Sequence, residues 1–489
     1  MCRFLLVSLN MGIILGEVTI GLRKRKLDKM THGNSLGDVY TTILTRLKAQ
    51  KAYRSVLGMK VLMWVLYSKR PLRAEELCHA LGVEIGSPDL DPENVPTVQT
   101  LVASCLGLVT LEASSSTVRL VHFTLQEHLS SNPTLFYSPH SMIAEVCLTY
   151  LNFGSVRDLS PTLDRVPATM LLLEYASVYW GEHARRGMTE NVKTLALRLL
   201  DRFDEHISAQ LLLLHHNQDT DRAQYSDREE GPVGFTGLHG AAFFGITEIV
   251  SPVLEMRERD VNADDCIGMK ALTWSSAKGH EGVVKTLSER EDVNPNQEDT
   301  IYGRTPLSWA AKSGHAGVVR MLLGREDVYP NHADTKYGQT PLSWAAAIGH
   351  EGVVKMLLER EDVNPDAGTI YGRSPLSWAA KSGHEGVVKM LLEREDVNPN
   401  QADRIYGQTP LSRAAGSGHE GVLKTLFERT DINPNPVDSS GRTLLSWAAG
   451  GGHGGVVKIL LQRKGVDPDP ADSSGRTPLS WAAGSGHGG

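Results

Sequence analysis

The stretch that decides the fold is G-R-T-P-L-S-W-A-A-K-S-G-H, residues 303–315. Related stretches follow one another along the C-terminal half of the chain, and successive copies start 34 or 35 residues apart. The copies start at Gly234, Gly268, Gly303, Gly338, Gly372, Gly407, Gly441 and Gly475, and the first two are the weaker ones. Self-similarity at a fixed period of this size predicts a stack of repeated units that together bury one continuous core.

Each part of the copy at Gly303 has a role in a pair of short helices. Thr305 is suited to cap the first helix through its hydroxyl, and Pro306 suits the first helical position because it lacks an N–H. Gly314 supplies the left-handed residue that ends this helix. The buried positions of the two helices follow the helical period. They are Leu307, Ala310 and Ala311 in the first helix and Val318, Val319, Leu322 and Leu323 in the second.

The pattern resembles the ankyrin repeat, whose signature is T-P-L-H-x-A with a usual period of 33 residues. The resemblance covers residues 233–489 and predicts about eight repeats. The last copy ends before its second helix, so we expect Trp481 to be poorly protected. The resemblance implies that the array binds another protein, whose identity the sequence does not disclose.

A histidine closes nearly every copy of the motif. Because the spacing of these residues is the repeat length, they do not converge on one point, and no metal site is predicted. The resemblance implies instead that this histidine bonds backbone at the turn between the two helices. The row comprises His280, His315, His350, His384, His419, His453 and His487.

A tryptophan recurs two residues after the core leucine, about 200° round the helix and off the core face. It either packs between repeats or lines the concave face, where stacked aromatic residues act as binding hot spots. The row comprises Trp274, Trp309, Trp344, Trp378, Trp447 and Trp481, with Arg413 in the remaining place. In the second alternative the partner-binding residues are Trp309, Trp344, Trp378, Arg413, Lys312 and Lys381, with Ala347 in the same groove.

Upstream of the array, residues 55–132 predict three helices, a two-stranded wing and a further helix, which is the order of a winged helix. The three helices are expected at 61–66, 73–81 and 97–106, the strands at 108–112 and 117–122, and the last helix through Leu125 and Leu129. Residues 133–215 predict a helical connector, and residues 216–232 are polar and predict a linker. The predicted fold class is therefore mainly α, with an ankyrin solenoid preceded by a winged-helix domain and a helical connector.

The segments K-R-P-L-R-A-E-E-L-C-H-A-L, residues 69–81, and R-L-V-H-F-T-L-Q-E-H-L, residues 119–129, carry a second resemblance. They are similar to the winged-helix segment, named after GPI inositol-deacylases, that follows the NACHT module in fungal NOD-like, ankyrin-tailed proteins. The resemblance covers roughly residues 1–230. That family carries a Walker A loop upstream, and this sequence has none, so residues 1–54 are expected to be remnant helices of a nucleotide-binding module. No cofactor is predicted.

One residue of this segment, His122, carries a separate hypothesis. It resembles the winged-helix histidine that contacts the nucleotide phosphate in NOD-like switches, and this role requires an NTPase upstream of Met1. The alternative is a core or capping histidine.

Composition narrows the function classes. The net charge of −7 and a third winged-helix segment, Thr97–Leu106, without Lys or Arg argue against nucleic acid. The apolar run between Phe4 and Leu15 is too short to span a membrane. The five cysteines are isolated and fit a reducing compartment, so a cytoplasmic location is expected.

A catalytic role is not predicted either. The G-x-S-x-G motif at 33–37 follows a charged run and not the apolar strand that a nucleophile elbow needs. No catalytic residue is therefore assigned. The function expected from the resemblances is that of the ligand-binding C-terminal part of a NOD-like sensor. The alternatives are a stand-alone ankyrin scaffold or inhibitor, and part of a NACHT switch whose NTPase lies upstream.

Overall fold

The computed structural model describes residues 19–22, 36–163, 165–218, 234–256 and 260–487. The chain divides into two compact units, residues 1–240 and 241–489. The G-x-S-x-G motif up to Ser35, the N-terminal apolar run and most of the expected linker lie outside the described residues.

The first part of the N-terminal unit has the winged-helix order predicted from the sequence. The elements are α3 (Leu36–Lys48), α4 (Ala52–Tyr67), α5 (Ala74–Gly82), η1 (Pro92–Asn94), α6 (Val98–Ser104), β1 (Val109–Leu111), β2 (Val118–Leu120) and α7 (Phe123–Ser130). A two-stranded antiparallel sheet follows the three helices α4, α5 and α6, and Val109 lies opposite Leu120 in its register. An isolated antiparallel bridge between Arg73 and Thr117 joins the residue before α5 to the wing.

The second part of this unit is helical, as predicted for the connector. Its core contains Trp180, Tyr175 and Phe153, all almost fully buried. The elements are η2 (Pro133–Leu135), α8 (Pro139–Leu151), α9 (Gly154–Arg157), α10 (Leu173–Arg186), α11 (Glu190–Leu200), η3 (Phe203–Glu205) and α12 (Ile207–Gln218).

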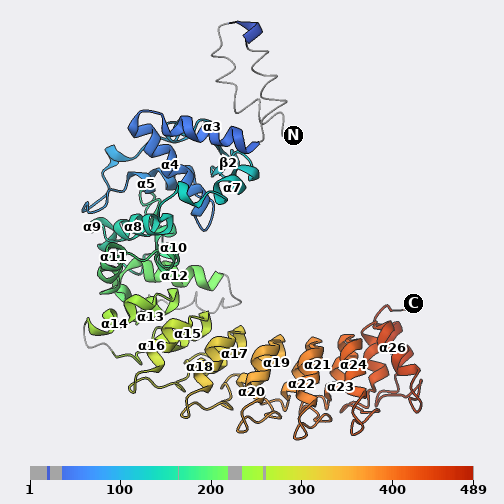
Figure 1. Ribbon diagram of the computed structural model, residues 1–489. Coiled ribbons are helices and arrows are strands. Elements are labelled where there is room, and N and C mark those ends of the chain that lie inside the picture. The colour runs from blue at the N-terminus through green and yellow to red at the C-terminus, as the bar shows by residue number, and fades with distance from the viewer. Residues whose placement is uncertain (1–18, 23–35, 164, 219–233, 257–259, 488–489) are drawn as a thin grey trace. The chain divides into compact units, whose positions relative to one another are not determined.

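The array is a succession of helix pairs, which Figure 1 shows from yellow-green to red. We call the first helix of each repeat inner and the second outer; inner helices of neighbouring repeats pack together, and so do outer helices. By repeat, the helices are α13 (Gly237–Phe244) and α14 (Thr247–Glu255), α15 (Ala271–Lys278) and α16 (Glu281–Ser288), α17 (Pro306–Ser313) and α18 (Ala316–Leu323), α19 (Pro341–Ile348) and α20 (Glu351–Leu358), α21 (Pro375–Ser382) and α22 (Glu385–Leu392), α23 (Pro410–Ser417) and α24 (Glu420–Phe427), α25 (Leu444–Gly450) and α26 (Gly454–Leu461), and in repeat 8 α27 (Pro478–Gly484).

The local predictions for repeat 3 are confirmed with one exception. The Thr305 hydroxyl accepts the Ser308 N–H at 3.2 Å, Pro306 begins α17, and Gly314 ends it in the left-handed region. All but one of the predicted core side chains are buried. Leu323 is only half-buried, because it lies at the last position of α18, at the edge of the inward face.

Candidate functional site

Five of the six tryptophans of the row each donate a hydrogen bond to a buried aspartate in the loop before their own helix. In repeat 3, Trp309 Nε1 donates to Asp299 Oδ2 at 2.9 Å, and the same carboxylate accepts the backbone N–H groups of Ile301 and Tyr302. The equivalent bonds join Trp274 to Asp265, Trp344 to Asp334, Trp447 to Asp438 and Trp481 to Asp472. We call these residues the loop aspartates; they fix the loop and the indole together.

Repeats 5 and 6 depart from this arrangement. In repeat 5 the loop position is Thr369, and Trp378 Nε1 is buried without a hydrogen-bond partner among the described residues. In repeat 6 the loop aspartate, Asp403, is kept, but the tryptophan is replaced by Arg413, whose Nη2 donates to Asp403 Oδ2. An unsatisfied buried donor costs about 1–3 kcal/mol, so the absence of this hydrogen bond lowers the stability of the fold at repeat 5.

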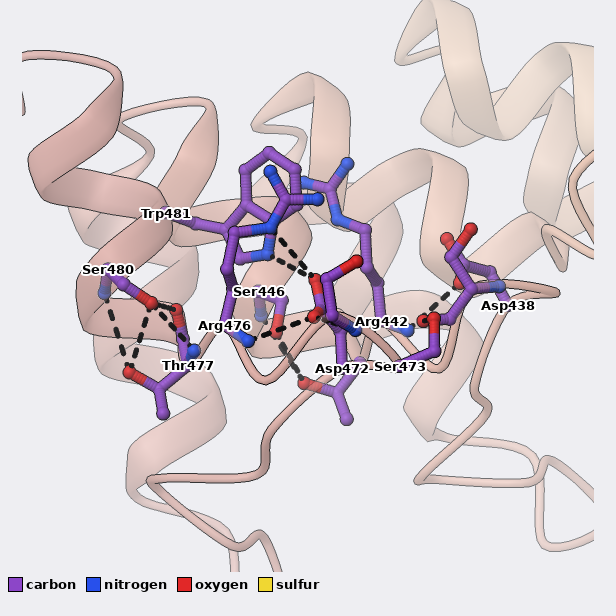
Figure 2. A network of polar contacts seen from close by, with 12 residues as sticks. Asp438, Arg442, Ser446, Asp472, Ser473, Arg476, Thr477, Ser480 and Trp481 are labelled. Carbon is purple, nitrogen blue, oxygen red and sulfur yellow. Dashed lines mark hydrogen bonds and ion pairs between the residues drawn. The ribbon is translucent and has the colours of Figure 1, made fainter.

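Cations lie between the indoles of neighbouring repeats. Arg304 lies 4.9 Å from the Trp309 ring and 4.2 Å from the Trp344 ring, and Lys312 lies near the same two rings. Figure 2 shows the same arrangement at the C-terminal end of the array, where the guanidinium of Arg442 lies 3.7 Å from the Trp481 ring. Such contacts contribute about 0.5–2 kcal/mol each, depending on exposure. The tryptophan row therefore holds adjacent repeats together.

The six residues predicted to bind a partner have unequal access to solvent. Trp309 is 3% exposed and Arg413 is 6% exposed, so neither offers a ligand more than a trace of surface. Trp344, Trp378 and Lys312 are half-buried, and Lys381 is exposed. For Trp309, packing between repeats is the observed role, because Arg304, Lys312 and the loop aspartate cover its ring. For the other residues, partner binding stays a prediction.

Six of the seven histidines of the row bond backbone, as the resemblance implied, and each bond reaches the repeat before its own. His350 Nε2 donates to the Lys312 carbonyl at 3.1 Å, and His419 Nε2 donates to the Lys381 carbonyl at 2.9 Å. The same bond joins His280 to Phe243, His315 to Ala277, His384 to Ala347 and His453 to Gly416. Within the described ranges, no group of three or more His, Cys, Asp or Glu side chains is arranged to hold a metal ion.

Each imidazole also fills the space beside the glycine that ends the preceding inner helix. A Cβ atom on Gly314 would lie 2.7 Å from the His350 ring, and one on Gly383 would lie 2.5 Å from the His419 ring. Both glycines have a positive φ, which other residues adopt only with strain. The glycine and the histidine of the motif are therefore one contact between neighbouring repeats.

The loop tips form a second continuous feature, which the sequence analysis missed. The backbone N–H of Arg404 donates to the Tyr371 carbonyl at 2.8 Å, and that of Ser439 donates to the Tyr406 carbonyl at 2.8 Å. Equivalent bonds link Thr335 to Tyr302, Ile370 to Tyr337 and Ser473 to Ser440. A signal was present in the sequence, because a tyrosine precedes the first glycine of the motif in repeats 3 to 6.

Asparagines join the loops on the outer side of the array. The Asn296 amide donates to the Asp327 carbonyl and accepts the Tyr329 N–H at 2.8 Å. Asn262, Asn331 and Asn400 make the same pair of bonds to their next repeats. In repeat 5 this position is Asp366, which accepts the Asn398 N–H but has no donor to offer, and its Oδ1 has no partner.

In the winged helix, His122 is the N-terminal cap of α7. Its Nδ1 accepts the Thr124 N–H at 3.3 Å, and the Thr124 hydroxyl lies 2.8 Å from the same nitrogen. His122 is therefore a capping histidine, which was the alternative to the nucleotide contact. The nucleotide contact stays a prediction.

Two family models match the chain. The model described as ankyrin repeats (3 copies) matches five overlapping segments, residues 238–334, 290–368, 326–403, 362–438 and 430–488. The model described as GPI inositol-deacylase, winged helix domain, matches residues 45–138. A search of curated proteins found no match to this chain. None of the described helices is long and apolar enough to cross a membrane.

Proposed function

The chain belongs to the ankyrin-repeat family, and we propose that its array holds a partner protein on the surface formed by the loop tips and the inner helices. Ankyrin repeats support a protein–protein interaction module and are typically not enzymatic. The observation that carries the surface assignment is the row of tyrosine-bearing tips in repeats 3 to 6, joined by backbone hydrogen bonds and partly exposed. Tyrosine is among the residues enriched in binding hot spots.

The test is site-specific crosslinking in cells that express the full chain. A photoreactive phenylalanine replaces Tyr406 at a loop tip, and the control replaces Lys389, which is exposed on the outer helix α22. We expect a discrete crosslinked protein from position 406 and none from position 389. Equal crosslinking from both positions, or none from either, would contradict the assignment.

The winged-helix match at residues 45–138, N-terminal to the array, supports a finer proposal. In it, the array is the ligand-detecting part of a NOD-like signalling protein in the cytoplasm. The described cysteines, which are all free thiols, agree with a reducing compartment. A stand-alone scaffold or inhibitor is the main alternative, and equilibrium dialysis with ADP separates it from a nucleotide-driven switch, because a scaffold binds no nucleotide.

A further inference from the structure

Cations and carboxylates along the tryptophan row are equal in number in repeats 3 and 4 and in repeats 7 and 8, but not in repeats 5 and 6. In repeats 3 and 4, the two cations beside the indoles, Arg304 and Lys312, are matched in number by the carboxylates of Asp299 and Asp334, and Arg304 Nε lies 3.5 Å from Asp334 Oδ2. In repeats 7 and 8, the cations Arg442 and Arg476 face the carboxylates of Asp438 and Asp472.

In repeats 5 and 6, three cations face a single carboxylate. Arg373 and Lys381 lie over the Trp378 ring, at 5.4 Å and 5.6 Å from its centre, and Arg413 stands where the next indole would be. The carboxylate is Asp403, which bonds Arg413 and lies 4.0 Å from Arg373. We call these three cations the 373–381–413 cluster.

The three cations are close enough to repel one another. Burial, followed by the charges of Arg413 and Arg373, holds the pKa of Lys381 below its ordinary value. The Nε atoms of Arg373 and Arg413 are buried without hydrogen-bond partners among the described residues, as are those of Arg304 and Arg442, so the excess of cations and not the unbonded Nε atoms distinguishes repeats 5 and 6. With one carboxylate, Asp403, against three cations, the cluster keeps an excess of positive charge among the described residues.

The negative charge missing from this region belongs to a single position. The carboxylate absent from this region is the loop aspartate of repeat 5, whose place Thr369 takes. Thr369 keeps one of its functions, because its hydroxyl accepts the Arg373 N–H at 3.1 Å, but it leaves Trp378 Nε1 without an acceptor. A carboxylate is therefore the group that this part of the row lacks.

Exposed apolar side chains flank the cluster on the tips of the same two repeats. Ile370 is 51% and Tyr371 37% exposed, and in the next tip Ile405 is 44% and Tyr406 55% exposed. The tips of repeats 7 and 8 carry serines in these places, at 439–440 and 473–474. The apolar tips and the uncompensated charge therefore coincide in repeats 5 and 6.

We propose that Lys381, the exposed member of the 373–381–413 cluster, binds a side-chain carboxylate of an acidic segment of the partner protein, with the charges of Arg373 and Arg413 behind it, while neighbouring apolar side chains of that segment contact the tips of repeats 5 and 6. This inference rests on the proposed function and adds to it the chemistry of the partner. A protein segment fits better than a nucleic acid, because phosphate backbones are bound by tracks of cations, whereas here three cations stand together beside apolar tips.

The experiment measures fluorescence anisotropy of a labelled octapeptide of alternating Glu and Leu on the full chain. We expect it to bind at least tenfold more tightly than the Gln–Leu octapeptide of the same length. The variant T369D supplies the missing carboxylate from within the chain and is expected to weaken binding at least tenfold. The variant K381A, at an exposed position, is expected to weaken it several-fold.

The matched control is D366N, in the same repeat and on the outer side of the array, which is expected to leave peptide binding unchanged. Equal binding of the Glu and Gln peptides, or wild-type binding by T369D, overturns the proposal. An octameric single-stranded DNA that binds as tightly and is equally sensitive to T369D also overturns it, in favour of a general anion site. Crosslinking at position 406 with peptide binding insensitive to T369D would reject the cluster and leave the proposed function standing.

Discussion

Repeats 3 and 5 have inner helices of one sequence, P-L-S-W-A-A-K-S, in α17 and α21. Their tryptophans nevertheless differ: Trp309 is buried and bonded to Asp299, whereas Trp378 is half-buried and its Nε1 has no partner in the described chain. The cause lies outside the helices, in the loop that precedes each one. The comparison shows that the loop residue decides whether the indole N–H is bonded, whereas the exposure of the ring does not follow it, since Trp344 is half-buried although it bonds Asp334.

The largest expected effect on stability comes from the contact between the helix-ending glycine and the next repeat's histidine, which repeats 3 and 5 share. In both G314A and G383A, a Cβ atom meets a histidine ring at a residue with positive φ, so we expect a loss of about 2–4 kcal/mol in the free energy of unfolding from each. Urea denaturation followed by circular dichroism measures it. The control is G352A in α20, where nothing lies within 4 Å, and a gain of about 0.5–1 kcal/mol is expected. A difference of more than twofold between G314A and G383A would mean that the two repeats do not share this contact.

Converting repeat 3 into repeat 5 gives the next effect. The variant D299T removes the acceptor of Trp309 Nε1 and of two backbone N–H groups, so we expect a loss of about 2–3 kcal/mol. Hydrogen exchange should locate the loss in repeats 3 and 4. A loss below about 0.5 kcal/mol would show that the loop aspartate does not hold the indole.

The reverse conversion has a smaller effect of opposite sign. In T369D the new carboxylate accepts from Trp378 Nε1 beside Arg373, and we expect a gain of about 1 kcal/mol, since a buried carboxylate loses part of its hydrogen-bond energy to desolvation. The melting temperature and the fluorescence of Trp378 report it. A T369D variant less stable than the wild type would contradict the interpretation that a carboxylate is missing here.

The smallest expected effect on stability comes from placing the asparagine of repeat 3 in repeat 5. In D366N the new amide can donate to the Asp396 carbonyl, as Asn296 donates to that of Asp327, so a gain of about 0.5–1 kcal/mol is expected at pH 7. Burial, and then Asp396, raises the pKa of Asp366. Because the folded state therefore holds this proton more tightly than the unfolded state, the wild type recovers stability as the pH falls through the raised pKa, and the gain from D366N should shrink there. A gain that grows on acidification would reject this assignment.

The helices of the array could be predicted because the signals are local. Thr305, Pro306 and Gly314 each act within one or two turns of the chain, and the core positions follow the helical period. The winged helix could be predicted equally well, because its helices and wing follow one another within a single segment. The tryptophan row could also be recognised in the sequence, but the sequence did not decide between packing between repeats and binding a partner.

The rest could not be predicted because it depends on side chains brought together across repeats. Trp309 contacts a loop residue ten positions earlier and a cation that also lies over Trp344 in the next repeat. No helical period encodes such contacts. The substitutions at Thr369 and Arg413 were readable in the sequence, but their meaning required knowledge of which residue the tryptophan bonds.

The most direct test of the central claim, that repeat 5 leaves a carboxylate position open for a partner, is the indole N–H region of a ¹⁵N correlation spectrum of the full chain. Resonances are assigned from single Trp→Phe variants, and the Glu–Leu octapeptide is then titrated in. The account predicts that the Trp378 indole shifts most and that this shift disappears in T369D. A Trp378 resonance that stays in place while the peptide binds, or equal shifts of all indoles, would contradict it.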